Sequence, residues 1–283
     1  MKFLDLGIIK LLKENEYSFC KSINSYCFST DRTFFTFYNS IFDDDYFFNR
    51  TIIDEANIFK INTNELFEKK LKTLTKVLEE KKITMNLHIS SDNILLKNFL
   101  IKKNFKQIDK VLGLQYPFIL KKKFLNVDDR CYIKHDYDFC IFVLDSPDLL
   151  KEWMDAYCSS FAICFEKKLS IYNIFKKKFD FFYFILYKTS SIDNKPFGES
   201  AGCCLLYPYK ESIALYCLGT IKEYRNRHIA TKIIDFAINF AQRKGYNTFG
   251  LQTLQSDNLL SFYGKKGFVE IYGNVIYRQI INR

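Results

Sequence analysis

The second half of the chain alternates between short apolar runs and amphipathic stretches. Alternating or continuous apolar positions predict strands at 139–144, 181–187, 200–207, 213–219, 248–254 and 269–279. Apolar residues three or four apart predict helices through 149–157, 169–179, 229–244 and 257–265. The predicted order is therefore strand, helix, helix, three strands, helix, strand, helix, strand.

The first half has a less regular pattern. It predicts helices at 4–24, 63–82 and 93–103 and strands at 83–89 and 108–116, and the stretch that ends at Phe48 is aromatic without a clear period. The polar segment 121–134 contains Lys121-Lys122-Lys123 and Asp128-Asp129-Arg130, which favours a linker. Because 283 residues suit two domains, we expect one at 1–120 and another at 135–283.

The two halves also share short segments in the same order. Ser91-Asp92-Asn93 parallels Ser256-Asp257-Asn258, and Lys102-Lys103-Asn104-Phe105 parallels Lys265-Lys266-Gly267-Phe268. A predicted helix lies between the paired segments in each half. This pattern indicates an internal duplication.

A basic turn at 223–228 joins the strand at 213–219 to the helix that begins at Ile229. The first N–H groups of a helix have no partner within it, and the helix dipole is positive there. Arg225 and Arg227 add positive charge beside this terminus. The sequence therefore predicts an anion site of the kind that holds a pyrophosphate.

This turn resembles the cofactor motif of the GNAT superfamily of acyl-CoA-dependent N-acyltransferases, Arg/Gln-x-x-Gly-x-Gly/Ala. The chain reads Arg225-Asn226-Arg227-His228-Ile229-Ala230, with His228 at the central glycine of the motif. Downstream, Phe262-Tyr263-x-x-x-Gly267-Phe268 also matches the family pattern. The resemblance covers the second half of the chain from end to end.

The resemblance implies an α/β (α+β) protein of two GNAT-like domains, each a mixed, mostly antiparallel sheet flanked by helices. The first copy would be degenerate, since Leu100 stands where Tyr263 does and Ile61-Asn62-Thr63-Asn64 replaces the cofactor motif. Acetyl-CoA would be the cosubstrate, without a metal. The residues expected to bind it are Leu218, Gly219, Thr220, Arg225, Asn226, Arg227, His228, Ile229, Ala230, Thr231 and Asn258.

The same resemblance makes Tyr263 the general acid that protonates the departing thiolate. A phenol of unperturbed pKa ~10 is well matched to that task. A general base is not evident, because the strand 213–219 contains no carboxylate. A water chain, Glu199 and Glu211 stay open as alternatives.

Composition limits the remaining possibilities. The net charge of +10 is spread over both halves, without the stripe or module that nucleic-acid binding would need. Nine cysteines without a C-x-x-C pair favour reduced thiols rather than disulfides or zinc. We find no secretory leader and no apolar run long enough for a membrane helix, so we expect a cytoplasmic protein.

The expected function is acetyl transfer from acetyl-CoA to a primary amine on a small molecule or a protein. One alternative is a catalytically inactive GNAT-like protein that binds CoA or acts as an interaction module. A second alternative is a transferase that uses aminoacyl-tRNA, although such an enzyme has little need for a pyrophosphate turn.

Overall fold

The computed structural model describes residues 5–24, 26–30, 33–42, 45–53, 64–118, 133–136, 139–189 and 198–279. The predicted linker at 121–134 lies outside these residues except for its last two positions, which begin strand β6 (Ile133–Asp136). Asp43 and Asp44, in the acidic stretch near Phe48, also lie outside them.

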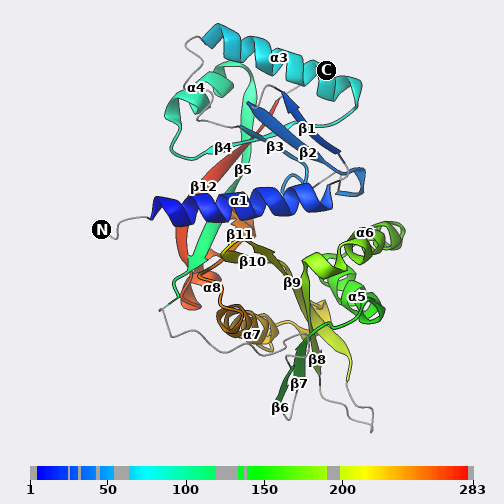
Figure 1. Cartoon of the computed structure of the whole chain (residues 1–283). Coiled ribbons are helices and arrows are strands. Elements are labelled where there is room, and N and C mark those ends of the chain that lie inside the picture. The colour runs from blue at the N-terminus through cyan, green and yellow to red at the C-terminus, as the bar shows by residue number, and fades with distance from the viewer. Residues whose placement is uncertain are drawn as a thin grey trace. The chain divides into compact units, whose positions relative to one another are not determined.

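The chain packs into two compact units that are not continuous halves of the sequence (Figure 1). The first unit contains Met1–Phe19, Leu114–Gln252 and Phe262–Val269. The second unit contains Cys20–Gly113, Thr253–Ser261 and Glu270–Arg283. The N-terminal helix thus enters the first unit, and the C-terminal strand enters the second.

The first unit contains the mixed sheet that the pattern of the second half predicts, in the order β11-β10-β9-β8-β7-β6. Its strands after β6 are β7 (Phe139–Val143), β8 (Tyr183–Thr189), β9 (Ser200–Tyr209), β10 (Ser212–Thr220) and β11 (Thr248–Leu254). Neighbours from β6 to β10 pair antiparallel, and β10 pairs parallel with β11. Its helices are α5 (Leu150–Phe161), α6 (Phe165–Lys177), α7 (Ile229–Arg243) and most of α1 (Leu6–Ile23) and α8 (Leu260–Lys265).

Helices cover both faces of this sheet because the strands are apolar on both sides. In β8, Tyr183 meets Phe240 of α7 on one face, and Phe184 meets Trp153 and Phe175 of α5 and α6 on the other. Figure 1 shows α7 and α5 on opposite sides of these strands. A strand buried on both faces reads as a continuous apolar run, which is the pattern that 181–187 shows.

Helix α1 lies on the same face as α5 and α6. Phe19 stacks on Tyr216 of β10 with ring centroids 3.7 Å apart and also contacts Phe182 and Tyr207. Asn15 is fully buried: its Nδ2 donates to the Tyr207 carbonyl and to Ser212 Oγ, and its Oδ1 accepts from Tyr216 Oη. The first helix of the chain therefore fixes the strand that leads to the basic turn.

The second unit has the strand order β1-β2-β3-β4-β12, with β5 beside β12. Its strands are β1 (Tyr26–Thr30), β2 (Phe34–Tyr38), β3 (Arg50–Ile53), β4 (Asn86–Ser90), most of β5 (Phe105–Tyr116) and β12 (Val269–Gln279). Helices α3 (Asn64–Glu80) and α4 (Ile94–Lys102) complete it. Its core joins Leu74 of α3 and Leu100 of α4 to Leu87 of β4 and Val275 of β12.

The duplicated segments occupy matching places in the structure. The first copy has the order β4, α4, β5, and the second copy has the matching order β11, α8, β12. Asn104 and Gly267 both have a positive φ, of 61° and 89°. A phenylalanine follows each of them: Phe105 begins β5, and Phe268 directly precedes β12. Asparagine and glycine are the residues that most readily adopt this left-handed conformation.

Some elements differ from the sequence-based expectation. The aromatic stretch before Phe48, for which no element is predicted, contains β1 and β2. In β2 the phenylalanines occupy both faces and hide the alternation, and β1 is only five residues long with a single phenylalanine. Helix α6 begins four residues earlier than predicted. The helix expected at 257–265 is a short 3-10 turn (Gln255–Asp257) followed by α8.

The role of α1 can be tested with Phe19→Ala. We expect the free energy of unfolding of the first unit to fall by about 3–5 kcal/mol, because a fully buried aromatic ring is replaced by a cavity. Urea unfolding followed by tyrosine and tryptophan fluorescence would measure it. Leu6→Ala on the same helix, at a side chain 79% exposed, is the control and should change little.

Candidate active site

Strand β10 separates from its parallel neighbour halfway along its length. Its pairing with β11 runs from Ser212↔Thr248 to Leu215↔Leu251, although β10 continues to Thr220. The register with β9 shifts between Tyr216 and Gly219, and Cys217 there has a left-handed φ of 55°. This bulge turns the last residues of β10 away from β11 and leaves their backbone groups outside that ladder.

Two glycines allow the displaced strand end to pack closely. A Cβ at Gly219 would lie 2.5 Å from Ser160 Cβ at the end of α5. A Cβ at Gly202 of β9 would lie 2.9 Å from the Gly219 carbonyl and from Ile229 Cγ2 of α7. The predicted residues Gly219 and Ile229 are thus brought together around the bulge, at a spacing that larger side chains would not permit.

The basic turn adopts a glycine-like backbone without a glycine. A 3-10 turn (Lys222–Tyr224) follows β10, and Asn226 and His228 then have φ values of 65° and 59°. His228 is the N-cap of α7 and makes no side-chain capping hydrogen bond. Histidine and asparagine tolerate the left-handed region better than most residues. The substitution of the central glycine in the motif therefore leaves the helix entry in a conformation that glycine would adopt.

The first turn of α7 has no acidic residue, so no carboxylate there opposes an anion. Ile229 is buried, and Ala230 and Thr231 are half-buried at this terminus. In β10, Leu218 and Thr220 are half-buried and Gly219 is buried. A bulged strand end and a helix N-terminus thus lie at the two ends of a turn eight residues long.

The two arginines of the turn differ in their contacts. Arg225 Nη2 donates to the Ser160 carbonyl at 3.1 Å, in the last turn of α5, and its Nε donates to the Thr220 carbonyl at 3.3 Å. A cation at a helix C-terminus interacts favourably with the helix dipole. Arg227 instead lies over the Tyr224 ring, 5.3 Å from its centroid, and is exposed. Arg225 thus holds the turn, and Arg227 faces solvent.

Tyr224 is fixed in turn by Glu199, whose carboxylate accepts a hydrogen bond from the phenol. This hydrogen bond, together with partial burial and the charge of Glu199, raises the pKa of Tyr224. Glu199 and Glu211 are the two glutamates left open as general bases. Glu199 accepts the hydrogen bond from Tyr224, and Glu211 is exposed in the hairpin turn between β9 and β10.

Tyr263 is buried in α8, at 6% exposure. Its ring meets the edge of Phe268, which also contacts Phe249 of β11 and Tyr116 of β5. Its carbonyl accepts from the backbone N–H groups of Lys266 and Phe268, which closes the helix. The aromatic cluster fixes the position of α8 on β11 within the first unit.

Asn258 belongs to the second unit and is exposed, with a left-handed φ of 56°. Its Nδ2 donates to the Ser256 carbonyl at 3.0 Å. The structure therefore gives Asn258 a local role in the loop between β11 and α8.

Ser160 is a site residue that sequence reasoning missed. It touches Gly219 and offers its carbonyl to Arg225, and its buried Oγ has no hydrogen-bond partner within the described part of the chain. Nothing in the local sequence distinguishes this serine from others on a helix. Only the packing of α5 against the bulge reveals it.

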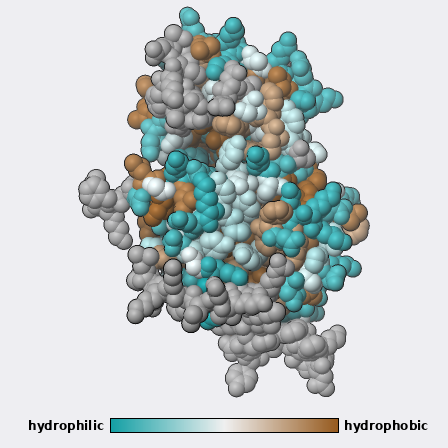
Figure 2. Space-filling view, in the orientation of Figure 1, coloured by the Kyte–Doolittle hydropathy of each residue, from teal (hydrophilic) through white to brown (hydrophobic). Residues whose placement is uncertain are grey.

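Exposed apolar side chains continue from this point along α5 and α6. Phe161, Phe165 and Leu169 are 48%, 82% and 67% exposed, and Phe161 contacts the Gly219 position. On the face shown in Figure 2, hydrophobic and hydrophilic residues are interspersed. The surface beside the end of β10 is therefore apolar at these three positions.

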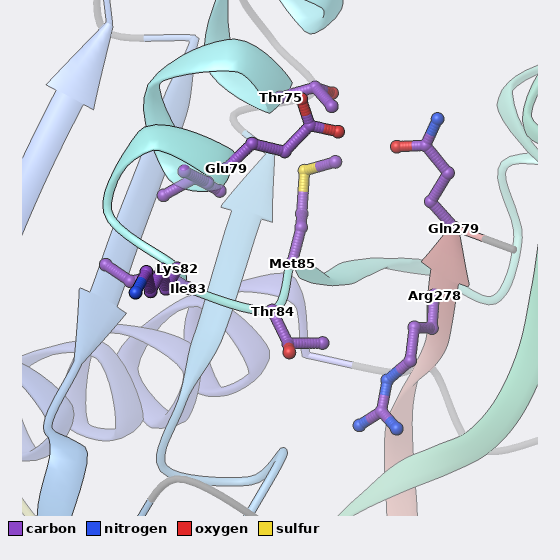
Figure 3. A pocket seen from close by; sticks show the side chains of 9 residues that line it. Thr75, Glu79, Lys82, Ile83, Thr84, Met85, Arg278 and Gln279 are labelled. Carbon is purple, nitrogen blue, oxygen red and sulfur yellow. The ribbon is translucent and has the colours of Figure 1, made fainter. Parts of the chain in front are cut away.

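Other kinds of site find no support in the described residues. Their His, Cys, Asp and Glu side chains form no group of three or more able to hold a metal ion. All eight cysteines among them are free thiols, and none of their helices is long and apolar enough to cross a bilayer. A cavity of about 400 Å³ in the second unit lies between Glu79, Met85 and Gln279 (Figure 3) and includes none of the predicted site residues.

The conformation of His228 can be tested with His228→Gly. A left-handed residue other than glycine costs about 1–2 kcal/mol, and the extra freedom of glycine in the unfolded chain offsets about 0.5–1 kcal/mol of this. We therefore expect the free energy of unfolding to stay constant or rise by up to about 1 kcal/mol. Thr231→Gly, inside α7, should lower it by about 1 kcal/mol. If His228→Gly lost as much stability as Thr231→Gly, the left-handed conformation of His228 would be contradicted.

Comparison with known proteins agrees with this geometry. The Acetyltransferase (GNAT) domain family matches residues 181–270, a span that contains every predicted site residue. No curated protein matches the sequence.

Solved structures of similar fold extend over nearly the whole chain. A GCN5-related N-acetyltransferase from Kribbella flavida has a TM-score of 0.63 at 11% identity, over 96% of both chains. A conserved protein of unknown function from Staphylococcus epidermidis has a TM-score of 0.60 at 12% identity, over 92% of this chain and 96% of its own.

A tandem GNAT protein from the clavulanic acid biosynthesis pathway has a TM-score of 0.56 at 8% identity, over 81% of this chain and 74% of its own. At such identities the likeness concerns the fold. The fold of this chain is thus that of two GNAT-like domains, and its residues 181–270 match the Acetyltransferase (GNAT) domain family.

Proposed function

We propose that the protein is an acetyl-CoA-dependent N-acetyltransferase that acts on a primary amine. The observation that carries this proposal is the bulged end of β10, followed after the basic turn by a helix N-terminus with a glycine-like entry and no acidic residue in its first turn. A free strand edge suits an amide-bearing arm, and a positive helix end suits a pyrophosphate. Acetyl-CoA has both groups in one molecule.

In this proposal the N–H groups of Ile229, Ala230 and Thr231 and the side chain of Arg227 hold the pyrophosphate. Arg225 keeps the turn in place through its bonds to Ser160 and Thr220. Leu218, Gly219 and Thr220 offer backbone groups to the pantetheine arm. Asn226 and His228 shape the turn through their left-handed conformations.

The reaction needs a polarised thioester carbonyl, a neutral amine and a proton for the leaving thiolate. A backbone N–H at the end of β10 would donate to the carbonyl oxygen as negative charge develops on it. The amine attacks the carbonyl carbon, the C–S bond breaks, and Tyr263 would give its proton to sulfur. A water chain or Glu199 would take the proton that the amine loses.

The first copy of the domain would lack the cofactor. Helix α3 occupies the place that α7 has in the second copy, and its first turn contains Glu65, whereas that of α7 contains no acid. A carboxylate at that position repels a pyrophosphate. This supports a degenerate first copy, within the proposed division into a degenerate domain at 1–120, a linker at 121–134 and a catalytic domain at 135–283. The free thiols fit the reducing cytoplasm.

An inactive, CoA-binding or interaction protein is the second candidate. It is favoured by the buried ring of Tyr263 and by the engagement of Arg225 with backbone carbonyls. A transferase that uses aminoacyl-tRNA gains no support from the acid-free turn at α7. Turnover measurements separate the acetyltransferase from the inactive protein, since only the acetyltransferase releases free thiol from acetyl-CoA in the presence of an amine.

The phosphate role of the turn can be tested with Arg227→Ala. We expect the Kd for CoA to rise by about tenfold, because a charge-assisted contact is worth roughly 1.5–3 kcal/mol. Calorimetric titration would measure it at two salt concentrations. Arg243→Ala, at the far end of α7, is the control and should bind as the parent does. Equal affinities for Arg227→Ala and the parent would remove this residue from the site.

The general-acid role can be tested with Tyr263→Phe. The ring stays in its aromatic cluster, so CoA binding should be retained. We expect kcat to fall by about 10²- to 10⁴-fold in a thiol-release assay, because only the proton donor is lost. Tyr116→Phe, in the same cluster, is the matched control. A parent that binds CoA but shows no turnover with any amine would favour the inactive candidate.

A further inference from the structure

We propose that helix α4 is a contact surface for a second copy of this chain, which packs on it antiparallel across a twofold axis. The inference is independent of the proposed function. All residues that carry it lie within the second unit.

Helix α4 is apolar around most of its circumference. Six of its nine residues are apolar. Leu96 and Leu100 are buried in the core of the unit. Ile94, Leu95 and Ile101 point elsewhere and are 66%, 77% and 57% exposed. Because a helix that is hydrophobic all round is normally covered all round, and contiguous exposed apolar side chains mark interaction sites, we infer that a partner covers this outer face.

The exposed residues of α4 form one stripe with Asn98 at its centre. At 3.6 residues per turn, the stripe covers an arc of about 120° and consists of Ile94, Leu95, Asn98, Ile101 and Lys102. Leu95 and Ile101 lie at equal distances on either side of Asn98, and so do Ile94 and Lys102. The stripe therefore has the same spacing when it is read in either direction. An antiparallel contact between two identical helices requires this property.

This spacing decides which side chains meet in the antiparallel pair. The two Asn98 side chains face each other, and each amide donates to the Oδ1 atom of the other. Each Leu95 packs against Ile101 of the second copy. Ile94 packs against the aliphatic stem of Lys102, whose ammonium group stays in solvent. One polar pair within an apolar contact fixes register and orientation, as a buried asparagine does in coiled coils.

The charges at the ends of α4 favour the antiparallel orientation. Asp92, just before the helix, is exposed, and Lys102 and Lys103, at its other end, are exposed as well. The antiparallel orientation places Asp92 near the lysines of the second copy and sets the two helix dipoles head to tail. A parallel orientation would bring lysines against lysines, and like charges across an interface are costly.

Hydrogen bonds hold both ends of α4, so the stripe lies on a fixed element. Asn93 Oδ1 accepts from the Leu96 backbone N–H at 3.0 Å, which caps the first turn. The Lys103 backbone N–H donates to the Phe99 carbonyl at 3.2 Å, which closes the last turn. A preformed surface loses little conformational entropy when a partner binds.

Helix α3 extends the patch at one end (Figure 1). Phe67 of α3 lies 5.3 Å from Phe99 between ring centroids, and Glu68 pairs with Lys103 at 2.7 Å. Leu66, in the same turn of α3, is 43% exposed. A contact between two such short helices belongs to the small interfaces, below about 1,200 Å², that form weak complexes. We therefore expect a dimer with a Kd of about 10 µM or weaker.

The test measures association of the full-length protein by sedimentation equilibrium, over a concentration range that spans the expected Kd. The parent should show a reversible monomer–dimer equilibrium. Asn98→Asp and Asn98→Lys each place like charges face to face, so each variant alone should raise the Kd by about tenfold or more. An equimolar mixture of the two variants should associate at least as tightly as the parent, because opposite charges then meet at the centre of the contact.

Asn173→Asp, at an exposed position of α6, is the matched control and should keep the parent Kd. Restored association in the mixture also shows that both Asn98 variants fold. A parent that stays monomeric over the whole range would overturn the proposal. So would dimers of Asn98→Asp alone, or a mixture that does not associate, because only a twofold contact centred on Asn98 predicts the rescue.

Discussion

The bulge at Cys217 is the local constraint on which the rest of the site depends. A single left-handed residue ends the pairing of β10 with β11 and displaces Gly219 toward the end of α5. That displacement brings the Ser160 carbonyl within reach of Arg225, which fixes the turn before α7. Without the bulge the strand would continue beside β11 with its backbone groups paired. Positions 202 and 219 need glycine because a Cβ at either would lie within 3 Å of a neighbouring segment.

The sequence predicted the element order from residue 139 onward because those strands and helices have strong, distinct periods. It placed β11 and β12 at the bounds that the structure has, and it identified the turn at 225–228 as a helix entry. It did not reveal Ser160, the bulge at Cys217 or the buried Arg50, whose Nη2 donates to Cys20 Sγ, because these depend on packing between distant segments. The sequence did not predict β2 because phenylalanine occupies both of its faces, and it did not predict β1 because five residues with one phenylalanine show no clear period.

The division into units changes how the duplication is understood. A cut in the predicted linker would separate α1 from Tyr207 and Tyr216, and β12 from β4, although both pairs pack within one unit. Each copy therefore depends on a segment that the other half of the chain encodes.

The buried amide of Asn15 has a consequence for synthesis on the ribosome. Its partners Tyr207 and Tyr216 lie 192 and 201 residues downstream, so the helix that holds it is made long before the strands that receive it. Until then Phe19 and Leu12 have no core to enter, and the last strand of the chain must still emerge to pair with β4. Chains with such distant contacts fold slowly and expose apolar surface in the meantime. The apolar face of α1 therefore stays uncovered until the strands that receive it have been synthesised.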